Sequence, residues 1–313
     1  MRAFVTGGTG FLGGRLVERL RGRGDEVVAL VRPPGKAERL EKLGCELVEG
    51  DLASRDVLAE AMRGCDAVFH VAADYRIGIR GSERAGMFEV NVTGTRNVLE
   101  GAGDVARIVY VSTNNVLGNT RGKVVDETYG RPESEWLSAY DESKFLAHRL
   151  VQERIAEGAP IVVVQPGGIY GSGDHTEMGA LLARAARGKV VVLPLGSVGL
   201  NWALVDDVAD GVLLAHDRGK VGETYILGGE IGTLRQGVEE AFAAGGHRPR
   251  IVPVPTALLR LAAPVGPLLG RNVREILSAS DGVTYWGTDA RARRELGYAP
   301  RGLAEGLRQT FAG

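Results

Sequence analysis

Cysteine is scarce in this chain of 313 residues, and an excess of charge of one sign is missing. Only two cysteines occur, Cys45 and Cys65, which argues against a disulfide framework and fits a reducing, cytoplasmic location. The 38 basic and 39 acidic side chains leave a net charge of -1, so no overall field attracts nucleic acid. The five histidines show no metal-ligand spacing with the cysteines, and we expect no metal site.

Long unbroken apolar runs are also missing. Residues Arg2–Thr6 already have the pattern of a buried strand, which leaves no room for a cleaved signal sequence. The stretch Ile251–Gly270 is mostly apolar but contains four prolines, whereas a membrane span needs about 20 residues of nearly unbroken helix. We therefore expect a short packed helix at Thr256–Ala263 and no stable membrane insertion. An apolar flap over an apolar substrate or a membrane surface is the alternative.

Glycine is abundant, at 46 residues, and 44% of the chain is hydrophobic, which suits a soluble globular protein of one or two domains. In the first half, short β-branched runs alternate with amphipathic helical patterns. This alternation predicts the α/β class, with a Rossmann-type doubly wound parallel sheet whose continuously apolar strands are covered on both faces. The predicted strands are Ala3–Thr6, Glu26–Val31, Cys45–Glu49, Ala67–His70, Arg107–Ser112 and Pro160–Gln165.

The pattern loosens after Pro166. We predict a first domain over residues 1–166, to which part of about 203–228 returns, and a smaller C-terminal α/β substrate-binding lid over 167–313. The elements expected in this second part are Gly179–Arg187, Val190–Leu193, Asp206–Asp217, Thr224–Leu227 and Leu303–Phe311.

A glycine-rich turn directly follows the first predicted strand and leads into an amphipathic helix. Residues 6–13 read TGGTGFLG, and two glycine registers fit, TGxxGxxG from Gly7 and GxGxxG from Gly8. Glycine lets the backbone approach a pyrophosphate, and the amides at the helix N-terminus meet its negative charge. The turn therefore predicts a dinucleotide site that includes Gly7, Thr9, Gly10, Phe11, Leu12 and Gly13.

The end of the second strand indicates which dinucleotide binds. An NAD site usually has Asp or Glu about 20 residues beyond the glycines, to bind the ribose hydroxyls. Here Arg32 takes that place, and Lys36 and Arg39 follow closely. A guanidinium complements a 2′-phosphate in charge and geometry. NADP is therefore the predicted cofactor, with NAD possible; the alternative is that Arg32 is a solvated loop cation.

Further candidate cofactor residues follow later strands. In an open α/β sheet, ligands bind at the carboxyl ends of the strands. Asp51 and Leu52 follow the third strand, where Asp51 is placed to bond the adenine amino group. Small residues that let the backbone approach a cofactor follow the fourth strand, and these are Val71, Ala72 and Ala73.

Tyr140 and Lys144 lie four residues apart on a predicted helix, and hence on one face. A phenol with a pKa near 10 is a poor acid–base catalyst at pH 7. A neighbouring ammonium and an oxidised nicotinamide would favour the phenolate, so we expect the pKa of Tyr140 to fall toward the working range. With only eight tyrosines and six lysines in the chain, an accidental pair at this spacing is unexpected. An i,i+4 surface pair is the alternative.

A third group should donate a hydrogen bond to the substrate oxygen. Ser112 and Thr113 both carry hydroxyls at the end of the fifth strand. Thr113 is favoured from its distance to Gly118 in the family pattern given next, and Ser112 remains the alternative.

These motifs together resemble the extended short-chain dehydrogenase/reductase superfamily, of the NAD-dependent epimerase/dehydratase type. TGxxGxxG, GDL, HVAA, NVxGT, ST, YxxxK and QPGGIYG occur in the family's order, and VDDVAD and RELGYAPR match its C-terminal signatures. Gln165 replaces the family's usual Arg. Arg32 and the segment Ala72–Arg76 look most like the dihydroflavonol 4-reductase-like branch, which includes bacterial members called hopanoid-associated sugar epimerases.

The resemblance implies a mechanism. Hydride from NADPH attacks a carbonyl held by Thr113 and Tyr140, Tyr140 supplies the proton, and Lys144 holds the cofactor ribose. Pro166 and Ile169 would flank the nicotinamide. Asn91 would support a relay behind Lys144 or serve a structural role.

Four functions compete. We expect an NADP-dependent carbonyl reductase or alcohol dehydrogenase that acts on a small apolar or aromatic substrate. The main alternative is an NAD-dependent sugar-nucleotide 4-epimerase that keeps its cofactor bound. A 4,6-dehydratase is disfavoured because Asn114 and Asn115 replace the family's Asp-Glu, and the intact Thr-Tyr-Lys set disfavours a non-enzymatic NADP sensor.

The residues that contact substrate are harder to identify. We nominate Tyr75, His175 and Trp202, with Thr113, and note Arg76, Met178, Leu200 and Asn201 in the same loops. Core packing is an equal alternative for each. By analogy with the superfamily, helices Phe88–Gly101 and Ala139–Glu157 would form a homodimer interface.

Overall fold

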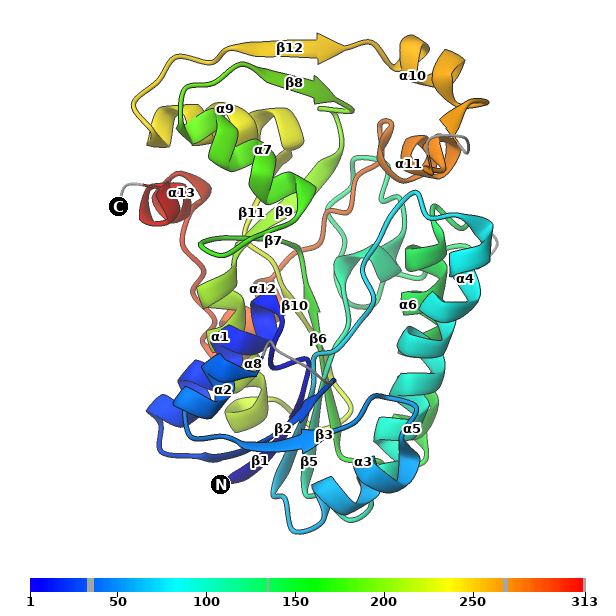
Figure 1. Ribbon diagram of the computed structural model, residues 1–313, viewed down its shortest axis with the longest axis vertical. Coiled ribbons are helices and arrows are strands. Elements are labelled where there is room, and N and C mark those ends of the chain that lie inside the picture. Colours follow the sequence, from blue (N-terminus) through cyan, green and yellow to red (C-terminus); the bar gives the residue numbers. More distant parts are fainter. Residues whose placement is uncertain (33–36, 134, 267–269, 312–313) are drawn as a thin grey trace.

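The computed structural model describes residues 1–32, 37–133, 135–266 and 270–311 (Figure 1). Strands and helices alternate up to Pro166. The elements are β1 (Arg2–Thr6), α1 (Phe11–Gly22), β2 (Glu26–Val31), α2 (Glu38–Lys42), β3 (Glu46–Glu49), α3 (Arg55–Met62), β4 (Ala67–His70), α4 (Gly81–Phe88), a π-helical segment (Glu89–Thr93), α5 (Gly94–Gly101), β5 (Arg107–Val111), a 3₁₀ turn (Asn114–Leu117), α6 (Ala139–Ala156) and β6 (Ile161–Pro166).

The remaining elements are β7 (Gly168–Tyr170), α7 (Glu177–Ala186), β8 (Val191–Pro194), β9 (Gly199–Leu204), α8 (Val205–Arg218), β10 (Thr224–Leu227), β11 (Glu230–Thr233), α9 (Leu234–Ala244), β12 (Ile251–Val254), α10 (Thr256–Ala262), α11 (Val273–Ser280), α12 (Ala290–Leu296) and α13 (Leu303–Phe311). Most predicted boundaries agree within two residues. The predicted helix Phe88–Gly101 is instead the end of a longer helical run in which the π-helical segment joins α4 to α5.

A seven-stranded parallel sheet forms the centre of the molecule. Its strand order is β10-β6-β5-β4-β1-β2-β3. From β1 the sheet is extended on one side by β2 and β3 and on the other side by β4, β5 and β6. The carboxyl ends of β1 and β4 therefore border the crevice in which open α/β sheets bind ligands. This topology confirms the predicted Rossmann-type fold.

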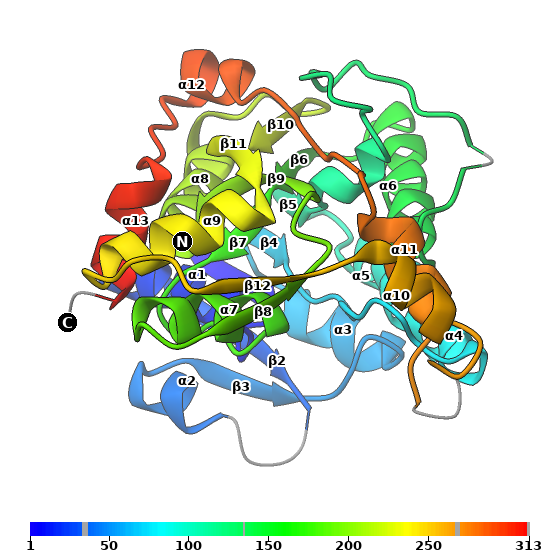
Figure 2. The same cartoon turned by 90° about the horizontal axis from the view of Figure 1, so that it is seen from above.

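Helices cover both faces of the sheet (Figure 2). Because successive side chains of a strand point to opposite faces, Val5 packs under α1, α8 and α12, and Phe4 packs under α3, α5 and α6. The covering helices supply buried residues such as Leu16 and Val212 on one face and Leu58 and Val151 on the other. Most buried positions of these strands are therefore apolar, and Thr6, His70 and Gln165 are polar exceptions toward the carboxyl ends.

The lid comprises the elements of residues 167–313 other than α8, β10 and α12. It contains a three-stranded sheet of order β11-β9-β7 and a parallel pair, β12-β8. α7, α9 and α13 pack around a separate core that includes Trp202 and Phe242. α8 and β10, by contrast, lie against the central sheet, where β10 pairs with β6. In the described part of the chain, no helix is long and apolar enough to cross a membrane.

Candidate active site

The turn between β1 and α1 is built so closely that only glycine fits. Gly7 has φ +76°, and a Cβ there would lie 2.8 Å from the Ala72 nitrogen. A Cβ at Gly13 would overlap the Gly7 carbonyl oxygen. Gly10 caps α1 without a side-chain hydrogen bond, and no acidic residue occupies the first turn. The amides at this helix N-terminus therefore suit a pyrophosphate, as NAD or NADP would present.

The neighbouring strand ends are tied to this turn. The Thr6 hydroxyl accepts hydrogen bonds from the Val71 and Ala72 amides, both at 3.2 Å, and contacts His70 Nδ1 at 2.8 Å. This places Val71 and Ala72 against the glycine turn. The exposed Ala73 follows, while Thr9, Phe11 and Leu12 belong to the turn and the first residues of α1.

Other predicted cofactor residues lie at neighbouring strand ends. Asp51 Oδ1 accepts from the Ala53 amide and the Ser54 hydroxyl, each at 2.9 Å, which fixes the turn after β3. Leu52 packs against Gly94. Pro166 ends β6, and Ile169 lies in β7, across the carboxyl edge of the sheet.

Arg32 lies exposed just after β2, at the position of the missing acid. Within the described residues its guanidinium has no carboxylate partner. Arg39, in contrast, bonds Glu18 at 2.5 Å and lies against Gly14. Lys36 falls outside the described residues. Among the described residues no ion pair occupies Arg32, and its role as the 2′-phosphate ligand stays a prediction.

Tyr140 and Thr113 meet at the carboxyl end of β5. Tyr140, in the first turn of α6, is buried near the Thr113 side chain, whose hydroxyl donates to Asn115 Oδ1 at 3.1 Å. Thr113 also caps the 3₁₀ turn by accepting from the Asn115 amide at 3.2 Å. The Tyr75 ring stands edge-on to Tyr140, with ring centroids 4.8 Å apart. A hydroxyl pair in this arrangement can hold one carbonyl oxygen.

Lys144 lies one helical turn beyond Tyr140 and is equally buried. Its ammonium donates to the Tyr110 hydroxyl at 3.2 Å and to the Val111 carbonyl at 3.1 Å. Both partners belong to β5, so the strand sets the direction of this side chain.

The pKa of Tyr140 shifts against the sequence-based expectation. Burial raises the pKa of the Tyr140 phenol, and the nearby Thr113 side chain offsets only part of that rise. Burial also lowers the pKa of Lys144 to about 7. The chain's own residues therefore do not lower the phenol's pKa, because desolvation of both groups outweighs the nearby cation; the fall expected with an oxidised nicotinamide stays a prediction.

Ser112 points away from Tyr140, into a polar chain between β5 and α6. Its hydroxyl contacts His148 Nδ1 at 3.2 Å, and Tyr110, two residues earlier on β5, faces the same side of the strand. Burial, together with the Lys144 charge, lowers the pKa of His148 to about 4. The sequence contained a signal for this row of polar side chains. Tyr110 and Ser112 are two residues apart on a strand, and Lys144 and His148 are four residues apart on a helix, so each pair faces one side.

Two asparagines near the site have distinct roles. The Asn91 side chain donates to the Asp74 carbonyl (3.0 Å) and the Ser143 hydroxyl (2.9 Å), so it fastens the loop after β4 to α6. Asn114 follows Thr113 and is buried, yet neither polar atom of its amide has a partner in the described chain. An unpaired buried amide is costly, which makes Asn114 a candidate substrate contact that the sequence analysis overlooked.

The nominated substrate residues divide into exposed and buried positions. Tyr75 is 56% exposed beside Tyr140. His175 is exposed in the turn before α7, and no ring contact or hydrogen bond among the described residues joins it to Tyr140. The nomination of Trp202 is wrong. Trp202 is 1% exposed and packs on Tyr170 and against Gly237 of α9, so it belongs to the core of the lid.

Asn201 is a second buried position among these loops. Its side chain is hydrogen-bonded to both backbone groups of Gly287. That pairing makes it a structural residue of the lid.

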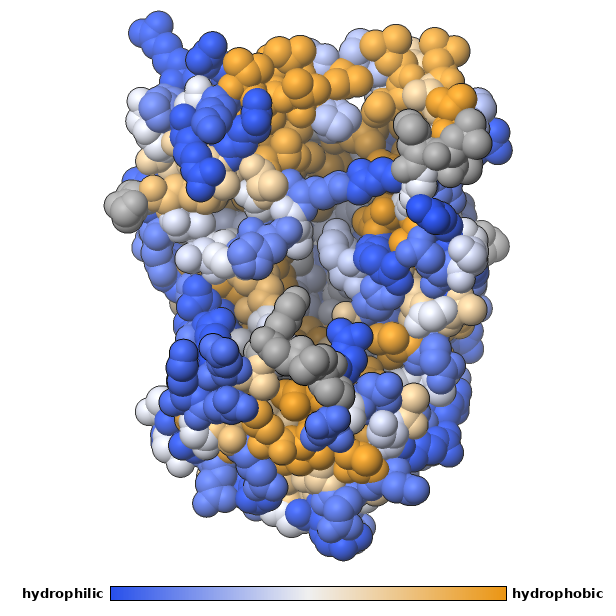
Figure 3. All heavy atoms as spheres, viewed as in Figure 1, coloured by the Kyte–Doolittle hydropathy of each residue, from blue (hydrophilic) through white to orange (hydrophobic). Residues whose placement is uncertain are grey.

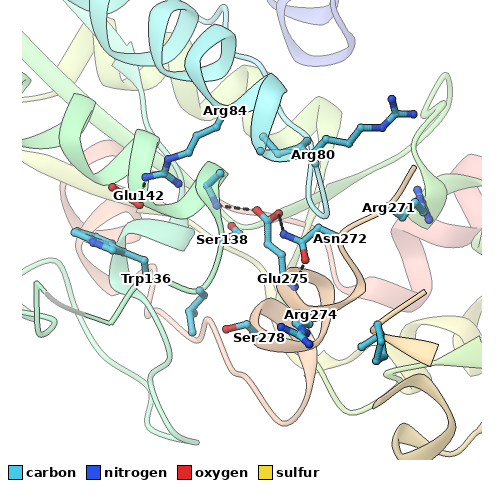
Figure 4. A pocket seen from close by; sticks show the side chains of 16 residues that line it. Arg80, Arg84, Trp136, Ser138, Glu142, Arg271, Asn272, Arg274, Glu275 and Ser278 are labelled. Atoms are coloured by element: carbon cyan, nitrogen blue, oxygen red, sulfur yellow. Dashed lines mark hydrogen bonds and ion pairs between the residues drawn. The ribbon is translucent and has the colours of Figure 1, made fainter. Parts of the chain in front are cut away.

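A pocket of about 880 Å³ adjoins the start of α6 (Figure 4). Its walls come from α4, the segment before α6, and α11. Glu275 of α11 accepts a hydrogen bond from the Ala139 amide at 2.7 Å, while Arg84 of α4 pairs with Glu142 at 2.6 Å. The lid therefore contacts the helix that carries Tyr140 through a charged side chain at its first residue.

Fold and site together define a nucleotide-dependent enzyme of the extended short-chain dehydrogenase/reductase type. The profile of the NAD dependent epimerase/dehydratase family matches residues 3–228. The chain belongs to that family, which confirms the resemblance seen in the motifs.

Similar proteins include both reductases and epimerases. A Stigmatella aurantiaca 4-hydroxy-2-methyl-3-oxo-4-farnesyl-3,4-dihydroquinoline-1-oxide ketoreductase is 34% identical over 313 residues, covering 96% of this chain and 92% of that protein. A Synechocystis protein provisionally named dihydroflavonol 4-reductase is 38% identical over 236 residues, covering 72% and 67%. The structure of Thermus thermophilus UDP-glucose 4-epimerase with NAD superposes with a TM-score of 0.79 and 26% identity, covering 100% and 98%.

Proposed function

We propose that this protein is an NADP-dependent reductase of ketones, or dehydrogenase of the corresponding alcohols. The observation that carries the proposal is the buried set of Thr113, Tyr140 and Lys144 beside a glycine cradle. Arg32, exposed in place of the usual acid, supports NADP over NAD.

When bound, NADPH supplies a hydride to the carbonyl carbon. The chain's own residues bind and protonate the carbonyl oxygen. Thr113 and Tyr140 donate hydrogen bonds to it, and Tyr140 transfers its proton as negative charge develops there. Burial raises the pKa of Tyr140, so the phenol keeps its proton at neutral pH until the oxygen becomes basic.

Lys144 stabilises the phenolate that remains after proton transfer. Its charge lies one helical turn away, and β5 holds it in place through Tyr110 and Val111. With burial lowering the pKa of Lys144 to about 7, this side chain can release and regain a proton near neutral pH. We propose that Tyr110, which accepts from Lys144, and Ser112, which contacts His148, carry that proton between β5 and α6.

An apolar or aromatic substrate fits the surroundings of Tyr140. Tyr75 lies against its ring, and Ile79 and Met87 pack beside it. The name of the Stigmatella relative describes a ketone with a farnesyl chain. We therefore propose that a hydrophobic ketone binds here, with the amide of Asn114 pairing a polar substituent.

A sugar-nucleotide 4-epimerase that retains NAD is the second candidate. The likeness to UDP-glucose 4-epimerase favours it, because both activities need the same acid–base pair. The exposed Arg32 counts against it, because a resident NAD would be expected to meet an acid there.

The deciding experiment has two parts. The purified protein is denatured and any released nucleotide is identified; separately, NADPH and NADH oxidation is followed with a panel of hydrophobic ketones, with Tyr140→Phe as the control. NADPH oxidation that Tyr140→Phe abolishes supports the reductase. Tightly held NAD, with interconversion of UDP-sugars and no ketone reduction, would replace it with the epimerase.

Two further properties complete the proposal. The unpaired Cys45 and Cys65 suit a reducing cytoplasm. We also propose a homodimer in which α5 and α6 of two copies pack together, as sedimentation at several concentrations can check.

A further inference from the structure

Exposed apolar side chains gather on one edge of the lid. Five of the nine large hydrophobic residues that are exposed in the described chain lie on β8, β12, α10 and the segment after it. They are 50–77% exposed, and we call them the apolar edge: Val192, Val252, Leu258, Leu261 and Val265. Figure 3 shows orange along the top of the molecule, where Figure 1 places these elements.

The secondary structure shows that this edge is not an ordinary outer surface. In β8, Val191 and Leu193 point into the lid core, so Val192 points outward, where a polar residue is expected. Val252 is its direct neighbour in the register of β12. α10 has no buried residue, and two of its exposed side chains are leucines, Leu258 at 57% and Leu261 at 77%. The helix predicted here thus exists, but the prediction that it packs into the fold was wrong, because none of its residues is buried and an apolar face is exposed.

Cations border the apolar edge. Lys189, Arg248 and Arg250 precede the same two paired strands and are exposed. None of the three forms an ion pair with a carboxylate in the part of the chain that the structure describes. An apolar face with a basic margin complements an anionic lipid surface, where apolar side chains enter and cations meet the headgroups.

We propose that the apolar edge docks this protein peripherally on anionic membranes. α10 has seven residues, so it can lie in the interface but not cross the bilayer. A second copy of the chain fits less well, because a two-fold contact through this edge would bring the two basic margins toward each other. Docking would place α11 and the pocket beside α6 near the lipid. A hydrophobic ketone would concentrate there, although the docking itself does not depend on the proposed reaction.

Vesicle co-sedimentation of the full chain tests the proposal. We expect binding to vesicles of phosphatidylglycerol and phosphatidylcholine, and weak binding to phosphatidylcholine alone. The double variant Leu258→Asp/Leu261→Asp should bind at least roughly 100-fold more weakly, since each leucine loses its apolar burial. The matched control is Val124→Asp/Val221→Asp, which places two aspartates at exposed valines elsewhere, 54% and 49% exposed, and should bind nearly as the unmodified protein does.

The basic margin gives an independent test. Arg248→Glu/Arg250→Glu should lose about tenfold or more of its affinity for anionic vesicles, and added salt should weaken the unmodified protein similarly. All variants should keep their thermal midpoints and their NADPH oxidation with a water-soluble ketone. A failure of docking is therefore separable from a failure of the proposed function.

Two results would overturn docking. One is the absence of binding to anionic vesicles at low salt, or equal binding by the leucine variant. The other is a dimer in solution that Leu258→Asp/Leu261→Asp converts to monomer while neither form binds vesicles, since the edge would then be an interface between copies.

Discussion

Two regions of the molecule differ in what they bury. The contact between β5 and α6, which we call the seam, buries polar side chains with partners, whereas the apolar edge on β8, β12 and α10 exposes apolar side chains. In the seam, Lys144 and Ser112 are buried and each polar group meets a named partner. At the edge, Leu261 is 77% exposed and α10 buries nothing. Contacts from several elements fix the reacting groups, whereas the lid surface is constrained by few contacts and is free to vary with substrate or location.

The largest effect is expected in the seam, at its reacting hydroxyl. Tyr140→Phe should lower kcat by about 10³-fold or more, because the proton donor to the carbonyl oxygen is gone. NADPH affinity, followed by quenching of protein fluorescence, should change only a few-fold. Tyr75→Phe is the matched control, since it alters the adjacent ring's hydroxyl and should cost a few-fold at most. Comparable rates for Tyr140→Phe and the unmodified protein would remove Tyr140 from the mechanism.

The next effect concerns cofactor choice. Arg32→Asp should weaken NADPH binding by about 10- to 100-fold, as charge-assisted bonds to the 2′-phosphate are lost, and leave NADH binding similar or better. Arg63→Asp makes the same charge change on a surface helix turn and should leave the preference intact. Titration with both cofactors decides the matter; an unchanged ratio would mean that Arg32 is a solvated cation.

A third effect is in stability and its pH dependence. Burial lowers the pKa of Lys144 to about 7 from 10.5, so above pH 7 the unfolded chain binds more protons than the folded one. The free energy of unfolding should therefore gain about 2 kcal/mol from this group between pH 7 and 9. His70 and His148, whose pKa values burial lowers to about 3 and about 4, titrate below this window.

Lys144→Met should lack that gain in urea unfolding of the cofactor-free protein. Lys42→Met, at an exposed lysine of α2, should retain it. A pH slope that is the same in Lys144→Met and in the unmodified protein would show that the ammonium is not desolvated.

The smallest effect tests the lid core. Trp202→Phe should reduce the free energy of unfolding by about 1–2 kcal/mol, through the lost contact with α9, and leave KM for a ketone unchanged. A changed KM with full stability would return Trp202 to the substrate site.

Regular spacing made much of this architecture predictable. The strand–helix alternation, the glycine turn and the Tyr140–Lys144 pair are local patterns, and local patterns survive in the fold. Thr113 and Ser112 differ only in which side of a strand end they face, and that depends on α6 packing against β5. Trp202 could not be placed because the register of β9 between β7 and β11 depends on segments about 30 residues apart.

Glu275 joins α11 of the lid to the first turn of α6, the helix that carries Tyr140. Its carboxylate receives the Ala139 amide, so a bulky guest that pushes α11 outward would leave the first turn of α6 without that acceptor, one residue from Tyr140. An oversized substrate would then bind more weakly, because side chains are displaced, and react more slowly, because the phenol is misaligned. Discrimination by size would consequently appear in turnover more strongly than in affinity.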